Sequence, residues 1–267
     1  DRNRTSPFAF TGNKFEFRML GSSNSIACAN IMLNAAVAES LKRYADQLEK
    51  ADDFESALHD MIRQVIKDHK RIIFNGNGYD ESWIREATEQ RGLLNLRTTP
   101  DALPTILEKK NVDMLTAHKV FSVAEIQSRY EITLENYCKS VNIEALTMVD
   151  MARKEILPAV EAYVRDLSDT LRAKKAAVPG AAAKYETGLI ARLSALTDEI
   201  DDAAAALERA MIQYKAIGDI TEAANMIRDV ILQKMAELRV PCDEAETLTA
   251  EKYWPFPTYG DLLFGVR

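Results

Sequence analysis

Residues 184–214 read KYETGLIARLSALTDEIDDAAAALERAMIQY, and their apolar side chains recur at the spacing of one helix face. The stripe consists of Tyr185, Leu189, Leu193, Leu196, Ile200, Leu207, Met211 and Tyr214. Upstream, residues 122–175 carry an almost continuous helical pattern with a kink expected at Pro158. The stretch AAVPGAAA (176–183) supplies a turn between the two. We therefore expect two helices of about 34 residues in an antiparallel hairpin about 50 Å long.

Helical patterns also extend outward on both sides of this hairpin. Residues 26–50 form a predicted helix whose first half is apolar nearly all round, so we expect it to be buried on several sides. Further helices are predicted over 54–71, over 220–238, at Thr99-Pro100, and from Asp80 to Gly92. The aromatic and proline-rich tail, YWPFPTYGDLLFGVR (253–267), is predicted to be an extended strap that docks on the body.

The stretch FAFTGNKFEFR (8–18) has a different period. Its phenylalanines alternate with other residues in two runs separated by TGN, which predicts a β-hairpin with an aromatic face. Lys14, Glu16 and Arg18 would project from the opposite face. A two-stranded ribbon alone is marginally stable, and no third strand is evident in the sequence. Either a helix covers the hairpin or its sheet partners precede Asp1, and we favour the second alternative.

Composition limits the classes of function. The chain has 267 residues, 47% of them apolar, which is enough for a substantial core. Its net charge of −7 argues against a broad surface for nucleic acid or acidic membranes. Three widely spaced cysteines fit a reducing compartment, and no apolar run is long enough to cross a bilayer. We expect a soluble, cytoplasmic protein.

The charged face of the predicted hairpin is the strongest candidate site. Glu16 is a hard oxygen ligand suited to Mg²⁺ or Mn²⁺, and Lys14 and Arg18 could hold phosphate or carboxylate groups beside it. Arg4 lies on the approach to the hairpin and adds another cation. Phosphoryl transfer needs such an ensemble. The alternative is a half-exposed strand whose outer face alternates in charge, and spacing alone favours that alternative.

Other motifs favour structural roles. FNGNGYD (74–80) lacks the lysine and hydroxyl ending of a phosphate loop, so an ordinary loop between helices is expected. His59, His69 and His118 show no metal-ligand spacing and are expected to be partly exposed helical residues. Cys28, on the apolar helix, is expected to be a small core residue.

Several stretches resemble a known enzyme family. NRTSPFAFTGNKFEFRMLGSSNS (3–25) is similar to the last catalytic strands of glutamine synthetases. NGNGYDESWIREATEQRGLLNL (75–96), TTPDALP (98–104) and YWPFPTYGDLLF (253–264) resemble the large type III enzymes in particular. The resemblance runs essentially from end to end.

The resemblance implies an ATP-dependent ligase that makes glutamine from glutamate and ammonia through γ-glutamyl phosphate, with Mg²⁺ or Mn²⁺. It implies that Glu16 binds a metal, that Arg18 contacts glutamate or the transferred phosphoryl group, and that Arg4 contacts ATP phosphate and substrate in a catalytic role. Lys14, where the family usually has arginine, would lie near ATP. Ala9 replaces a second arginine of the shorter enzymes, and the other metal ligands and the ammonium site of the family have no counterpart in this sequence.

The periodicities predict a mainly α fold, a long-helix bundle with an antiparallel helical hairpin, preceded by a short β-hairpin. The resemblance implies that this β-hairpin is left over from a catalytic α+β domain. Residues 1–21 would end the catalytic domain and 22–121 would complete it with helices, 122–250 would form a long-helix region, and 251–267 the strap. The N-terminus would be a cut, and the fragment alone inactive. The family implies a ring-shaped homo-oligomer, dodecamer-like, without nucleic acid or membrane partners. The alternative function is a helical assembly module without its own activity.

Overall fold

The structure is a computed structural model that describes residues 8–12, 14–18 and 25–265. It is mainly α-helical with one two-stranded antiparallel sheet, as the sequence predicted. The chain divides into two compact units, Asp1–Tyr130 and Glu131–Arg267. None of the helices among the described residues has the length and apolar character to span a bilayer.

The first unit begins with the predicted β-hairpin, strands β1 (Phe8–Phe10) and β2 (Phe15–Phe17). Phe8 pairs with Phe17, Ala9 with Glu16, and Phe10 with Phe15. Gly12 in the turn has a φ of 99°, a conformation that glycine adopts without a steric penalty. Within the described residues no third strand joins the sheet.

The aromatic face of the hairpin is open. The Phe8 ring stacks on Phe15 at 4.9 Å and meets Phe17 edge-on at 5.9 Å. The rings nevertheless remain exposed, from 43% for Phe17 to 61% for Phe15. The described helices therefore do not cover this face.

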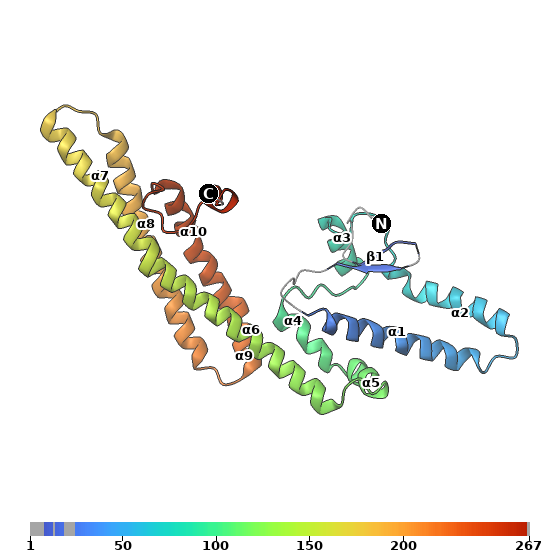
Figure 1. The fold of residues 1–267 in the computed structure, drawn as a ribbon. Helices are drawn as coiled ribbons and strands as arrows, with labels where there is room; N and C mark the ends of the chain where they lie inside the picture. The colour runs from blue at the N-terminus through green and yellow to red at the C-terminus, as the bar shows by residue number, and fades with distance from the viewer. Residues whose placement is uncertain (1–7, 13, 19–24, 266–267) are drawn as a thin grey trace. The chain divides into compact units, whose positions relative to one another are not determined.

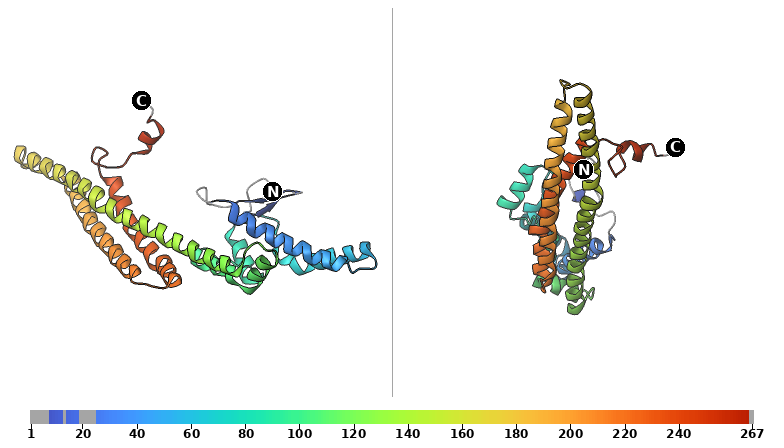
Figure 2. Two further views of the ribbon diagram at one scale, coloured as in Figure 1. Left: turned by 60° about the horizontal axis from the view of Figure 1, so that its bottom comes forward. Right: turned by 90° about the vertical axis from the view of Figure 1, so that its left-hand side faces the viewer.

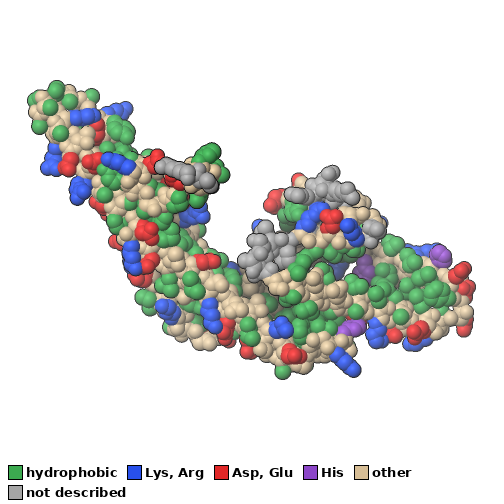
Figure 3. All heavy atoms as spheres, in the orientation of Figure 1, with side chains coloured by type: hydrophobic (Ala, Val, Ile, Leu, Met, Phe, Trp, Pro, Cys, Tyr) green, Lys and Arg blue, Asp and Glu red, His purple; other side chains and the backbone are tan. Residues whose placement is uncertain are grey.

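Helices α1 (Ala27–Leu48) and α2 (Phe54–His69) follow. Asp53 caps α2 by accepting a hydrogen bond from the backbone N–H of Ser56. The expectation that α1 is buried on several sides is wrong for the described chain: Ala35 is buried, but Cys28 is exposed and Val37 is 57% exposed. Figure 3 shows apolar side chains gathered over the α1–α2 pair. The described residues pack against one side of α1 and leave the rest of its apolar surface bare.

The remaining elements of the first unit are short. A 3₁₀ turn (Lys70–Ile72) precedes α3 (Glu81–Arg85), which continues as a π-helical turn (Glu86–Gln90). Asp80 caps α3 as predicted, and Gly92, at a φ of 62°, follows its end. The predicted helix at Pro100 is α4 (Thr99–Ala102), then come a 3₁₀ turn (Leu103–Leu107) and α5 (Lys109–Ala117). A small core joins α1 and α5 through Ala35, Leu115 and Ile126.

Long helices build the second unit. Helix α6 (Val123–Met151) leads into a π-helical turn (Ala152–Ile156) and then α7 (Leu157–Ala177). The π-turn lies just before Pro158, which has no backbone N–H to continue the regular pattern. Helix α8 (Lys184–Lys215) runs back along α7 after the predicted turn, and the two lie side by side in every view (Figures 1 and 2). The antiparallel helical hairpin is thus confirmed.

A third layer packs on α8. Helix α9 (Ile220–Met226), a π-helical turn (Ile227–Ile231) and α10 (Leu232–Leu248) form one helical run, and α10 contacts α8 along its length. The predicted apolar stripe of α8 lies in the core of this unit, where Leu193, Leu196, Ile200 and Leu207 are completely buried. Tyr185 is the exception, since its side chain is 67% exposed.

The C-terminal strap docks by its first residues. Tyr253 donates a hydrogen bond of 2.6 Å to Asp166 of α7, and its ring lies 5.2 Å from Tyr163. The strap is not extended throughout, because Thr258 and Asp261 form a capping box that starts the short helix α11 (Tyr259–Leu263). From Tyr259 to Phe264 the large apolar side chains are at least 67% exposed.

Candidate functional site

The charged face of the hairpin lies opposite its aromatic face. Glu16 lies across from Ala9, and Nη2 of Arg18 donates a hydrogen bond of 2.8 Å to Oε2 of Glu16. Ala9 is buried at 4% exposure, whereas the side chains of Glu16 and Arg18 are 37% and 22% exposed. The strand period therefore brings Glu16 and Arg18 together as predicted, at a partly sheltered position.

The ion pair favours the ionised form of Glu16. The hydrogen bond from Arg18 is the main cause that holds the pKa of the Glu16 carboxyl below its usual value, and attraction to Arg18 and Lys14 adds to it. Glu16 is therefore ionised at neutral pH and presents oxygens that can only accept. A carboxylate in this state is ready to bind a cation or to orient a guanidinium.

The two other predicted residues contribute differently. Lys14 is exposed at the end of the hairpin turn, where its backbone carbonyl accepts a hydrogen bond of 2.8 Å from the N–H of Thr11. Its charge acts on Glu16 through attraction rather than a hydrogen bond. Arg4 lies outside the described residues.

A divalent metal needs more ligands than this face supplies. Mg²⁺ takes about six oxygen ligands, which are usually one or two carboxylates together with waters and substrate phosphates, and Ca²⁺ takes about six to eight. Across residues 8–12, 14–18 and 25–265 no group of three His, Cys, Asp or Glu side chains is placed to hold a metal ion. The described part of the chain therefore offers one carboxylate, Glu16, toward such a site and does not form the site itself.

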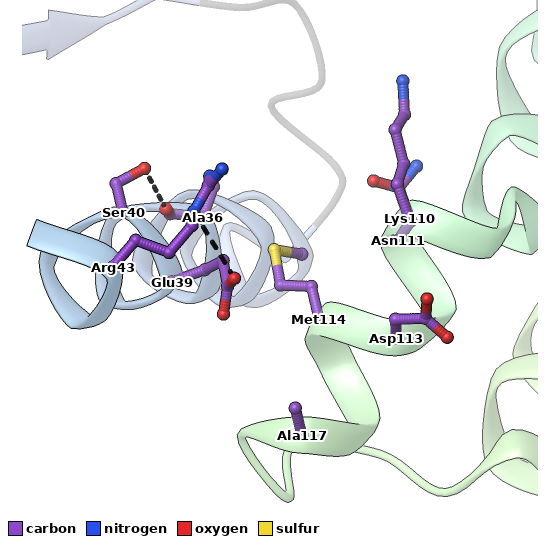
Figure 4. A pocket seen from close by; sticks show the side chains of 9 residues that line it. All are labelled: Ala36, Glu39, Ser40, Arg43, Lys110, Asn111, Asp113, Met114 and Ala117. Atoms are coloured by element: carbon purple, nitrogen blue, oxygen red, sulfur yellow. Dashed lines mark hydrogen bonds and ion pairs between the residues drawn. The ribbon is translucent and has the colours of Figure 1, made fainter. Parts of the chain in front are cut away.

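A groove between α1 and α5 was not predicted from the sequence (Figure 4). Its volume is about 480 Å³, and charged side chains of both signs line it: Glu39 and Arg43 from α1, Lys110 and Asp113 from α5. Across the two helices, Glu39 lies 2.9 Å from Nε2 of His118. Because these two residues are 79 positions apart, only the tertiary structure reveals their contact.

The groove has a structural explanation. Arg43 already pairs with Glu39 at 3.5 Å, and Lys110 pairs with Glu108 at 3.0 Å. His118 is partly exposed, as predicted, and its contact with Glu39 holds the end of α5 against α1. We assign no chemistry to this groove.

The loop at 74–80 is also structural. The Phe74 ring stacks on Trp83 at 3.8 Å, and Arg91 lies over the same indole at 4.7 Å. Arg91 also donates hydrogen bonds to the backbone carbonyls of Arg71 and Ile73. These contacts fasten the loop to α3, and a Cβ at Gly76 would lie 2.7 Å from the Phe74 ring, so this packing accounts for that glycine without a phosphate ligand.

Comparison with known proteins gives consistent matches. The family model described as "Glutamine synthetase C-terminal domain" matches residues 57–175. The whole chain is 38% identical to a glutamine synthetase of Butyrivibrio fibrisolvens, covering 38% of that protein. Over 99% of its length, the chain is 33% identical to a type-3 glutamine synthetase of Dictyostelium discoideum and 32% identical to a glutamine synthetase of Bacteroides fragilis. The aligned region covers 37% of each of these two proteins. The chain thus spans a little over a third of the length of these relatives.

Proposed function

Because this chain belongs to the glutamine synthetase family, we propose that it is the C-terminal part of a type III enzyme that joins ammonia to glutamate at the expense of ATP. In this reaction the γ-phosphoryl group of ATP passes to the side-chain carboxylate of glutamate. Ammonia then displaces phosphate from the γ-glutamyl phosphate. The proposed localisation is cytoplasmic.

The open aromatic face of the hairpin carries this proposal. Four phenylalanine rings between 43% and 61% exposed are placed as if to pack against further β-structure. The bare apolar side of α1, with Val37 at 57% and Leu41 at 60% exposure, indicates the same need for a cover. The relatives contain nearly two thirds of their length beyond the matched stretch, which is ample protein to supply it. The hairpin would then form one wall of an active site whose other walls come from that protein.

In this active site we propose a distinct role for each charged residue. Glu16 supplies one oxygen ligand to a divalent metal, Mg²⁺ or Mn²⁺, which when bound would neutralise phosphate charge. Arg18 contacts the glutamyl or transferred phosphoryl group, and its present hydrogen bond to Glu16 keeps the two groups adjacent. Arg4 and Lys14 contact the phosphates of ATP. The lowered pKa of Glu16 supports its role as an anionic ligand.

The activity test compares two proteins. The complete protein should form glutamine from glutamate, ammonia and ATP when Mg²⁺ or Mn²⁺ is present. The 267-residue chain alone should not, because its described residues include no group of three His, Cys, Asp or Glu side chains that could hold a metal ion. Glutamine formation by the isolated chain would contradict the proposal, and so would its absence from the folded complete protein.

A second role is favoured by the size of the helical region. Helices α6 to α10 account for most of the second compact unit, and we propose that they also serve assembly of a ring-shaped homo-oligomer, dodecamer-like. Deleting residues 122–250 from the complete protein should then reduce the particle to smaller species. An intact particle with altered kinetics would instead indicate a lid over the active site.

A further inference from the structure

The outer face of α8 carries an ordered pattern that its own packing does not explain. With about 100° of rotation per residue, six of its residues fall within an arc of about 80°. In order, they are Lys184, Gly188, Ala191, Ala195, Asp198 and Asp202, and all six are exposed. The buried stripe that contains Leu193 and Ile200 lies on the opposite side of the helix. This outer face is therefore directed away from α7 and α10, and it runs from a cation through small residues to carboxylates.

Two of these residues lower the stability of the helix that contains them. Lys184 is the first residue of α8, where the helix dipole disfavours a positive charge. Gly188 lies inside the helix, where glycine is less favourable than alanine. A Cβ at Gly188 would meet no atom within 4 Å, so packing among the described residues does not require glycine there. Contacts among the described residues therefore explain neither Lys184 nor Gly188.

The charged side chains at the two ends are available. Within the described part of the chain, Lys184, Asp198 and Asp202 make no side-chain ion pair or hydrogen bond, although many neighbouring charges are paired. Glu199, next to Asp198, pairs with Arg192 at 2.8 Å. With respect to the described residues, the outer face therefore has an unpaired cation at one end and two unpaired carboxylates at the other.

The pattern is complementary to itself. If a second α8 lies antiparallel across the first, with the twofold axis at the level of Leu193, the spacing of the six residues is symmetric. Lys184 then lies opposite Asp202 of the second copy and within one turn of its Asp198, while Ala191 lies opposite Ala195. Small residues at the centre let two helices approach closely, and the opposite charges meet at both ends.

We propose that the outer face of α8, from Lys184 to Asp202, binds the same face of a second copy of this chain in antiparallel orientation. A twofold contact must be self-complementary, and this face meets that condition in charge and in size. The proposed contact goes beyond the ligase activity and does not depend on it.

A competing register is less favourable. Arg209 also lies on the outer face and could reach Asp198 of a second copy if the axis lay near residue 203. That arrangement would bring the two Asp202 carboxylates close together near the axis, where like charges repel. It would also leave Lys184 and Gly188 without a role.

Charge reversal tests the contact in the complete protein. Lys184→Asp and Asp202→Lys should each raise the Kd of self-association about tenfold or more, as measured by sedimentation over a concentration series. The double variant restores opposite charges across the axis and should return the Kd to within about threefold of the original. Lys175→Asp, a reversal at another exposed lysine of the same hairpin, is the matched control and should leave the Kd unchanged.

Gly188→Leu separates association from folding. Leucine is a better helix former than glycine, so this variant should raise the melting temperature of the unassociated protein while its bulk weakens self-association. The proposal is overturned if Lys184→Asp and Gly188→Leu leave the Kd unchanged, or if Arg209→Asp weakens association and Lys184→Asp does not.

Discussion

Arg18, the residue that follows β2, donates a hydrogen bond of 2.8 Å to Glu16, two residues earlier on the same face of the hairpin. This hydrogen bond is the largest cause of the lowered pKa of Glu16. Arg18→Ala should therefore move the pKa of Glu16 up toward its ordinary value of 4.5, as followed by NMR titration of the carboxyl carbon. Lys14→Ala should produce a smaller change, because Lys14 acts through attraction alone. Equal effects of the two variants would contradict this account of the site.

The ionisation of Tyr163 tests the packing of the helical hairpin and the strap at alkaline pH. Burial, together with a hydrogen bond to Tyr185, raises the pKa of Tyr163 to about 12. Its contribution to stability is complete below the ordinary pKa of 10.0 and is lost as the pH rises through about 12. Ultraviolet titration should show one tyrosine that ionises near 12 and that is missing in Tyr163→Phe. A titration curve that Tyr163→Phe leaves unchanged above pH 11 would refute the assignment.

Glu186 allows a similar test of stability at acidic pH. It is buried at 4% exposure near the start of α8, and its hydrogen bond from Lys174 of α7 lowers its pKa below 4.5. The stability it contributes is present above the unfolded pKa and is lost as the pH falls through the lower folded value. Glu186→Gln should therefore reduce the loss of stability between neutral pH and the acid range, as measured by urea midpoints. Glu161→Gln, an exposed carboxylate of α7, is the control and should behave like the original protein.

The long-helix unit should depend on the α8 core. Leu196 is completely buried, so Leu196→Ala should lower the free energy of unfolding by about 2–5 kcal/mol through lost burial and the cavity left behind. Ile212 lies on the same helix but is 66% exposed, so Ile212→Ala should change the free energy of unfolding by less than about 0.5 kcal/mol. Chemical denaturation measures both values, and similar losses would mean that the assigned packing face is incorrect.

The sequence predicted those features that depend on neighbours along the chain. The α8 stripe, the turn at residues 178–183, the Asp80 cap and the alternating hairpin all follow from spacing of a few residues, and the structure confirms them. Tyr185 is on the predicted stripe but lies outside the core, because it is the second residue of α8, beside the turn, where its side chain is 67% exposed.

Features that depend on distant contacts could not be predicted in this way. The Glu39–His118 contact joins α1 to the end of α5, and no local pattern indicates it. The apolar pattern of α1 indicated burial on several sides, but the described residues cover one side of the helix. A pattern records that a surface is apolar and does not identify what covers it. The same limit applies to the charged face of the hairpin. Its pattern identifies Glu16 and Arg18 as candidate site residues, but it does not identify the groups that would complete the site.

The central claim is that the hairpin is one wall of a metal-dependent ligase site, and Glu16→Gln in the complete protein tests it most directly. The side chain keeps its size but loses its charge, so the melting temperature should change little. Glutamine formation at saturating Mg²⁺ should fall by about 100-fold or more if a metal-ligand carboxylate has been removed, a loss of about 2.7 kcal/mol in transition-state stabilisation. Turnover equal to that of the original protein, with the same dependence on Mg²⁺, would contradict the claim.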